Sequence, residues 1–91
     1  MMRMNSYTSD RWKSSLWRRD TRYYTIELRQ NLFGEWIVVR SWGDLGSKRG
    51  RQLEQVCDNI KSAELVFKKA EKRRITRKYQ LVIKDLSSEI N

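Results

Sequence analysis

The sequence predicts an α+β domain, a small antiparallel β-sheet with one α-helix packed across it. Two runs of residues alternate between apolar and polar side chains with a period of two, as half-buried strands do. A short loop containing glycine joins them, which is typical of a β-hairpin. A later stretch carries an apolar stripe at three- and four-residue spacing, the pattern of a helix that buries one side.

The predicted strands of the first half follow one another closely. A short strand is expected at Leu16–Arg18. A longer strand is expected over 22–30, where Tyr24, Ile26 and Leu28 would share one face. Residues 31–34 supply turn chemistry, with Gly34 available for a positive φ. The second strand of the hairpin is expected over 35–42.

The second half of the chain predicts a loop, a strand, the helix and a last strand. Three of the four glycines lie in the segment 43–50, which therefore predicts a sharply turning loop before a strand at 53–57. Either Asp58 or Asn59 can cap the helix that follows. The last strand is expected over 79–84, and the apolar stripe of the helix consists of Ile60, Ala63, Phe67 and Ala70.

Ninety-one residues are enough for one domain and too few for a deep, multi-walled active site. We expect a flexible basic N-terminal arm over residues 1–15, docked at its end through Trp12 or Trp17. The domain itself is expected over 16–84, and a short polar tail over 85–91.

The charge balance narrows the class of partner. Twenty Lys and Arg residues stand against eleven Asp and Glu residues, which gives a formal net charge of +9. Such a field attracts nucleic acid, an anionic membrane face or an acidic protein, although basic charges can also serve solubility alone. We expect no membrane partner, because no apolar run approaches the roughly 18 residues of a span and the helix stripe is needed to cover the sheet.

Several kinds of chemistry are excluded by composition. The chain contains no histidine and one cysteine, Cys57, so we expect no metal site, no cofactor and no intrachain disulfide. Its serines have no neighbouring base that would activate them, and no phosphate-binding loop or dinucleotide motif is present. The N-terminal residues lack the apolar core of a secretory signal. These features predict a non-enzymatic protein in the cytoplasm, a reducing compartment.

Three segments of the chain closely resemble the WGR domain, named for a central Trp-Gly-Arg: Tyr23–Leu28, Leu32–Trp36 and Val39–Gly46. The resemblance covers residues 16–80 and includes the basic end of the helix, Glu71–Arg74. This domain occurs in poly(ADP-ribose) polymerases and as stand-alone bacterial proteins, and the bacterial form is the most similar. It implies an antiparallel sheet with a helix across one face, in agreement with the pattern above.

The resemblance also implies a function and a set of residues. In the polymerases the domain binds DNA ends, and the tryptophan of the motif packs against the sugar of a terminal nucleotide, a role that would fall to Trp42. Residues just before the tyrosine pair reach the DNA as well, which points to Thr21 and Arg22. Two positions depart from the family pattern. Asp44 replaces the motif's arginine and would repel phosphate, and Lys78 replaces a common glycine.

Two clusters of candidate residues lie near the motif. Trp42 shares a strand face with Arg40, and it is either an exposed ring that stacks on a base or sugar or a core residue that closes the sheet. The second cluster belongs to the glycine-rich loop and is either a phosphate clamp or a solvated surface: Lys48, Arg49 and Arg51.

The densest basic stretch ends the helix, and from it we expect phosphate contacts by Lys72, Arg73 and Arg74. Helical spacing scatters these charges, so some of them simply face water. The sequence as a whole predicts a non-enzymatic nucleic-acid-binding module that takes DNA rather than RNA, at ends or single strands. The alternative is a protein-interaction module that docks onto an acidic partner or a DNA-processing enzyme.

Overall fold

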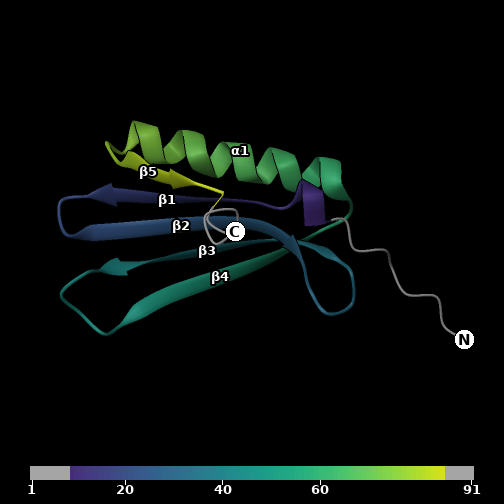
Figure 1. Ribbon diagram of the computed structural model, residues 1–91, viewed down its shortest axis with the longest axis horizontal. Helices are drawn as coiled ribbons and strands as arrows, with labels where there is room; N and C mark the ends of the chain where they lie inside the picture. The colour runs from purple at the N-terminus through teal and green to yellow at the C-terminus, as the bar shows by residue number, and fades with distance from the viewer. Residues whose placement is uncertain (1–8, 86–91) are drawn as a thin grey trace, which may run out of the picture.

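The computed structural model describes residues 9–85 of the chain. A turn of 3-10 helix, Ser9–Arg11, precedes the sheet and the helix (Figure 1). The elements that follow are β1 (Lys13–Arg19), β2 (Arg22–Gln30), β3 (Trp36–Asp44), β4 (Gly50–Cys57), α1 (Ile60–Thr76) and β5 (Gln80–Lys84).

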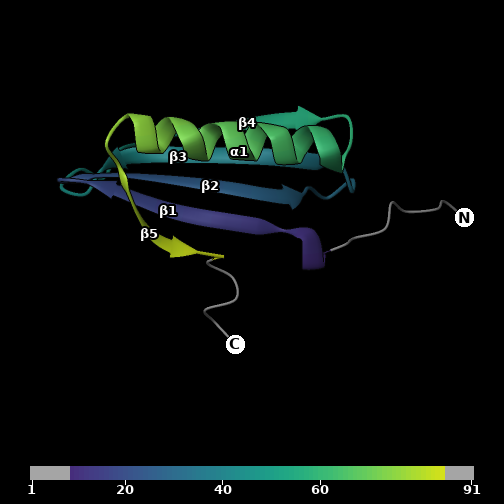
Figure 2. The same cartoon turned by 90° about the horizontal axis from the view of Figure 1, so that it is seen from above.

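All the strands pair antiparallel, in the order β4-β3-β2-β1-β5. The helix α1 lies across one face of the sheet, over β2, β3 and β4 (Figure 2). This arrangement confirms the predicted α+β fold, an antiparallel sheet with one helix packed across it. It leaves β4 and β5 as the two edges of the sheet.

The first strand begins at Lys13 rather than at the predicted Leu16. The reason is that Ser14 and Ser15 are buried, although their polarity suggested an exposed arm. The Ser15 hydroxyl accepts a hydrogen bond of 2.8 Å from the indole N–H of Trp17, which satisfies both polar groups inside the core.

The predicted arm and tail are described only in part. Residues 9–15 of the arm lie in the 3-10 turn and the first half of β1, whereas residues 1–8 lie outside the described residues. The Trp12 indole N–H donates to the side-chain oxygen of Gln30 over 3.2 Å, so this tryptophan docks beside the end of β2. Of the predicted tail, only Asp85 is described.

Strands β3 and β4 extend further than the alternation predicted. The sequence predicted strands over 35–42 and 53–57, but β3 continues to Asp44 and β4 starts at Gly50. Gly43 and Gly50 pair directly across these strands. The hairpin therefore runs through two glycines that a sequence pattern assigns to a loop.

The core lies between α1 and the helix-facing side of the sheet. Its largest contributions from the sheet come from alternate residues of neighbouring strands: Trp17, Tyr24, Ile26, Leu28 and Val38. The predicted stripe of α1 is buried against them at Ala63, Phe67 and Ala70. The same stripe continues to a charged residue, Arg74, which is only 9% exposed.

The helix cap and the turn of the hairpin form at residues that the sequence predicted. Asn59 is the N-cap of α1, and its side chain accepts a hydrogen bond of 2.9 Å from the Ser62 N–H. Gly34 adopts a φ of 80° in the β2–β3 loop, a conformation that strongly favours glycine.

Candidate nucleic-acid interface

Three segments that are distant in the sequence meet at one end of the molecule, on the left in Figures 1 and 2. They are the β1–β2 turn, the β3–β4 loop and the last turn of α1. The Leu45 N–H donates to the Thr21 carbonyl over 2.7 Å, and the Arg19 guanidinium donates to the Arg77 carbonyl over 3.3 Å. We call this region the basic end, because its segments carry Arg22, Lys48, Arg49, Arg51, Arg73, Arg74 and Arg77.

Trp42 lies at the basic end of β3 and is half-buried. Its indole stacks on the Tyr24 ring, with centroids 5.6 Å apart and planes 11° from parallel. The indole also lines an open hollow of about 480 Å³, the Trp42 hollow, together with Lys48, Arg49 and Arg51. Trp42 therefore packs against the core and also leaves part of its surface exposed at this hollow.

Glycine at two positions allows the paired ends of β3 and β4 to pack closely against the ring of Tyr23. A Cβ atom at Gly43 would lie 2.9 Å from the Tyr23 hydroxyl oxygen, and one at Gly50 would lie 2.7 Å from it. Carbon and oxygen atoms do not pack that closely without displacement. Glycine at the second position of the Trp-Gly motif thus has a steric cause.

Asp44 is held by local hydrogen bonds. Its carboxylate accepts 2.9 Å from the Gly46 N–H and 3.0 Å from the Thr21 hydroxyl. These two donors, with the Arg22 guanidinium nearby, lower the pKa of Asp44 below its usual value. The charged carboxylate therefore joins the β1–β2 turn to the β3–β4 loop, and the hydroxyl of Thr21 is engaged with it.

A second hollow of about 320 Å³ lies between α1 and strands β3 and β4. We call it the arginine groove, since its cationic lining consists of Arg40, Lys69, Arg73 and Arg74. Arg40 and Trp42 are two residues apart on the same face of β3, so the arginine groove adjoins the Trp42 hollow.

Arg74 combines burial with a full positive charge. The carbon of its guanidinium lies 3.8 Å from the centroid of the Tyr24 ring and 4.8 Å from that of Tyr79. Burial lowers the pKa of Arg74, with Arg77 and Arg73 adding to this effect and the two tyrosines opposing it. Arginine starts from so high a pKa that the group stays protonated at neutral pH. Its charge is stabilised by the faces of two aromatic rings.

The end of α1 positions Tyr79 beside Arg74. The Tyr79 N–H donates to the Arg74 carbonyl over 2.9 Å, and the Lys78 N–H donates to the Ile75 carbonyl over 3.0 Å. These are the two bonds of a Schellman motif, which needs a residue in the left-handed region. Lys78 occupies that position with a φ of 70°, where the resemblance implied a glycine.

The structure brings most of the predicted site residues into two groups. One lines the Trp42 hollow and consists of Trp42, Lys48, Arg49 and Arg51. The other lines the arginine groove and consists of Arg40, Arg73 and Arg74. Thr21 and Arg22 lie beside Asp44 at the β1–β2 turn. Lys72 is exposed and lies about 100° round the helix from Arg73, away from both hollows.

Two aromatic residues of the site were not expected from the sequence: Tyr24, which lines the arginine groove, and Tyr79, which contacts the Arg74 guanidinium. A signal was present for the unusual position of Arg74. Ala63, Phe67 and Ala70 repeat at four- and three-residue spacing, and the next position of that repeat is residue 74. A charged residue on an otherwise buried stripe indicates that specific neighbouring groups compensate its charge.

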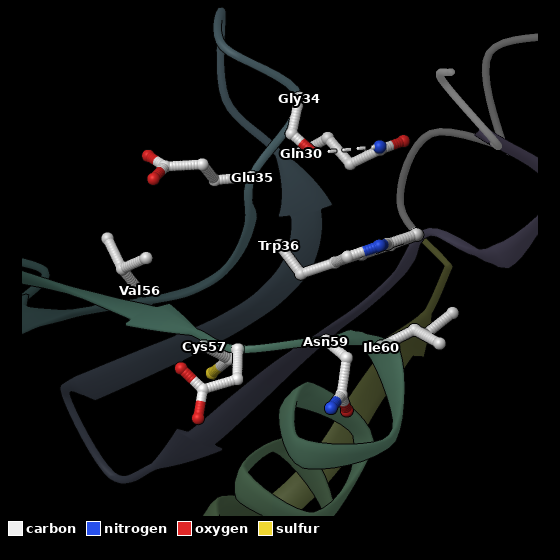
Figure 3. A pocket seen from close by; sticks show the side chains of 9 residues that line it. Gln30, Gly34, Glu35, Trp36, Val56, Cys57, Asn59 and Ile60 are labelled. Carbon is white, nitrogen blue, oxygen red and sulfur yellow. Dashed lines mark hydrogen bonds between the residues drawn. The ribbon is translucent and has the colours of Figure 1, made fainter. Parts of the chain in front are cut away.

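The opposite end of the sheet carries a hollow of a different kind (Figure 3). It measures about 590 Å³, and the Trp36 indole lies between Gln30 and the start of α1. Carboxylates of Glu35 and Asp58 line it, and no lysine or arginine of the described chain does. Burial raises the pKa of the Cys57 thiol there, and Asp58 adds to the effect, so the thiol is a poor nucleophile at neutral pH.

Residues 12–85, nearly the whole chain, match the family model of the WGR domain. The search of curated proteins and the search of solved structures found no match. In poly(ADP-ribose) polymerases this domain is a nucleic-acid-binding module, and it is a binding domain rather than a catalytic one. Within residues 9–85, no cluster of potential ligands could hold a metal ion, and no helix is long and apolar enough to cross a membrane.

Proposed function

The chain belongs to the WGR domain family, and from that premise we propose that it is a non-enzymatic module that binds nucleic acid at its basic end. The proposed ligand is DNA rather than RNA, bound at an end or as a single strand. The observation that carries this proposal is the Trp42 hollow. An indole seated on Tyr24 lines it beside cationic side chains from the β3–β4 hairpin.

The two kinds of side chain in the Trp42 hollow match the two parts of a nucleotide. A base or sugar packing on an exposed indole gains about 1–3 kcal/mol per base. Lys48, Arg49 and Arg51 are exposed, and none has an ion-pair partner within residues 9–85. Their positive charges therefore remain available to phosphates on either side of the stacked nucleotide.

A salt titration tests this proposal. Lysine and arginine release counterions when they neutralise phosphates, so affinity falls as salt concentration rises. If about four phosphates are engaged, raising the salt from 50 to 200 mM weakens binding to DNA by roughly 10²-fold. Fluorescence anisotropy with labelled single strand and blunt duplex measures this slope, and competition by unlabelled closed circular duplex measures any requirement for an end.

The outcome decides between mechanisms. A steep slope with preference for single strand or ends supports nucleotide stacking on Trp42 together with phosphate contacts. A flat response to salt would remove phosphate binding as the basis of the proposal. Equal affinity per site for closed circular and blunt duplex would restrict the proposal to backbone contacts.

An acidic protein surface is the second candidate partner, because guanidinium and ammonium groups bind carboxylates as well as phosphates. The open cationic lining of the Trp42 hollow favours it for the same reason as DNA. A protein that co-purifies at one-to-one stoichiometry after nuclease treatment, and that is released by Arg51→Glu, would favour this candidate.

We also propose a cytoplasmic location. The single cysteine, Cys57, permits no intrachain disulfide, which suits a reducing compartment. Cell fractionation with an antibody against the chain tests this, and recovery with secreted or membrane material would contradict it.

A further inference from the structure

The two flanks of α1 differ in how their positive charges are compensated. On the flank that faces β1 and β5, Glu64 pairs with Arg11 and Lys13, and Glu71 pairs with Lys84. The arginine groove lies on the other flank. There, no carboxylate within residues 9–85 forms an ion pair with any of the lining cations Arg40, Lys69, Arg73 and Arg74.

Two of these cations also contain a buried N–H donor that has no acceptor. The Nε atoms of Arg40 and Arg74 are buried, and neither has a hydrogen-bond partner within residues 9–85. Buried donors in folded proteins are almost always satisfied by protein, ordered water or a bound ion. Arg74 cannot turn outward to solvent without giving up its contacts with Tyr24 and Tyr79.

We propose that the arginine groove binds a phosphate group, held by the guanidinium groups of Arg40 and Arg74 and by the ammonium group of Lys69. An ordered water could satisfy a donor, but it would leave the positive charges of the groove uncompensated. A phosphate supplies both the acceptors and the negative charge. A guanidinium stacked on a ring keeps its in-plane N–H groups free for a bidentate contact, and the rings of Tyr24 and Tyr79 fix the orientation of Arg74.

This site goes beyond the proposed function, because it needs neither Trp42 nor a nucleotide base. Two sources share the required chemistry. One is a backbone phosphate of a nucleic acid whose nucleotide occupies the adjoining Trp42 hollow, and the other is a soluble phosphate or pyrophosphate. Phosphate binding in the arginine groove is tested first, and the origin of the phosphate is tested second.

Lys68 and Lys69 provide a matched pair for the first test. Both are exposed lysines of α1, but Lys69 lines the arginine groove, whereas Lys68 lines the flank that contains Glu64 and Glu71. Pyrophosphate is titrated into the full chain at constant ionic strength, with NMR amide shifts and calorimetry as readouts. Lys69→Gln should weaken binding about three- to tenfold and Lys68→Gln less than about twofold, since both lose one charge but only one loses a contact.

Arg40→Gln extends the test to a buried donor, and about a tenfold loss of pyrophosphate affinity is expected. Thermal melting checks that this variant folds, and the exposed Lys69 site carries the test if it does not. Equal losses for Lys68→Gln and Lys69→Gln would overturn the site in favour of general charge attraction. The absence of saturable pyrophosphate binding to the unmodified chain would also overturn it.

Competition identifies the source of the phosphate. A single-stranded oligonucleotide that displaces pyrophosphate assigns the groove to a backbone phosphate, whereas simultaneous binding assigns it to a soluble one. If DNA does not bind at all while pyrophosphate does, the proposed function fails and the groove site stands. An equal loss of pyrophosphate affinity in Arg49→Gln, which removes a cation from the Trp42 hollow alone, would overturn a separate groove site.

Discussion

Trp42 and Trp36 lie at opposite ends of the same face of β3, and the contrast between their surroundings is the basis for placing the proposed ligand beside Trp42. Both are half-buried, both pack against the core and both line an open hollow. The hollow of Trp42 has cations in its lining, and that of Trp36 has the carboxylates of Glu35 and Asp58. Residue type and burial are therefore shared, and the charge of the neighbours distinguishes the two ends.

One titratable group at each end of β3 has a shifted pKa. At the basic end, hydrogen bonds from the Gly46 N–H and the Thr21 hydroxyl lower the pKa of Asp44. At the Trp36 end, burial and the charge of Asp58 raise the pKa of Cys57. The two pKa shifts have opposite signs and different causes, since local hydrogen bonds act on Asp44 and burial acts mainly on Cys57.

The largest expected difference is between the two tryptophans. Trp42→Ala should weaken binding to single-stranded DNA by about 10- to 100-fold, because stacking of one base is lost. Trp36→Ala removes a similar half-buried indole from the acidic end and should change the affinity less than about twofold. Fluorescence anisotropy at one fixed salt concentration measures both variants.

Stability has to be measured for the same pair, because each indole packs against the core. Thermal melting gives the fraction folded at the binding temperature, and affinities are compared only for folded protein. Equal losses of affinity in both variants would remove the functional distinction between the two ends.

The next effect concerns the glycines that shape the Trp42 hollow. Gly43→Ala places a Cβ atom against Tyr23 and should lower the free energy of unfolding by about 1–2 kcal/mol. Gly46 lies in the β3–β4 loop, and a Cβ there would have its nearest contact at 3.5 Å, from the Asp44 carboxylate. Gly46→Ala is therefore the control and should be nearly neutral in urea unfolding. A neutral Gly43→Ala would show that Tyr23 moves aside at little cost.

A smaller effect is expected at the end of α1. Lys78→Gly should raise the free energy of unfolding by about 0.5–1 kcal/mol, because the left-handed conformation strains a residue that has a Cβ atom. Lys78→Ala removes the same charge and keeps the Cβ atom, so the difference between the variants isolates the backbone term. Urea unfolding measures it, and a less stable glycine variant would contradict the assignment of strain to Lys78.

The smallest effects are pH dependences of opposite sign at the two ends. Asp44 has a lowered pKa in the fold, so its carboxylate stabilises the protein above its unfolded value of about 4 and loses this contribution as the pH falls through the folded pKa. Cys57 has a raised pKa, so its contribution is present below about pH 8.5 and is lost as the pH rises through the folded pKa.

Melting temperatures of Asp44→Asn and Cys57→Ser, measured against the unmodified chain from acid to alkaline pH, test these signs. The gap between the unmodified chain and Asp44→Asn should narrow below about pH 4. Above about pH 9, the melting temperature of the unmodified chain should fall relative to that of Cys57→Ser. Parallel curves across the whole range would contradict both assignments.

The fold could be predicted because period-two alternation and a helical stripe are local properties of the sequence. Ile26 and Leu28 in β2, and Ala63 and Phe67 in α1, are buried as their spacing indicated. The early start of β1 was not predictable in the same way. Ser15 is polar by type, and only the hydrogen bond from Trp17 makes its burial favourable.

The candidate site could be predicted as a set of residue types but not as two hollows. Arg40, Arg73 and Arg74 come from β3 and from the end of α1, and their meeting depends on where the helix crosses the sheet. The role of Asp44 depends on Thr21, which reaches it from another turn. Such contacts between distant segments leave no pattern in the sequence of either segment.

If the arginine groove binds phosphate as proposed, Arg74 serves both folding and recognition with the same atoms. It occupies a core-facing position of α1, so methionine or leucine there would complete an apolar surface against the sheet and would strengthen the fold. The same replacement would remove a donor from the arginine groove. Laboratory evolution for heat resistance alone would therefore discard the arginine, whereas evolution under a requirement for anion recognition would retain it.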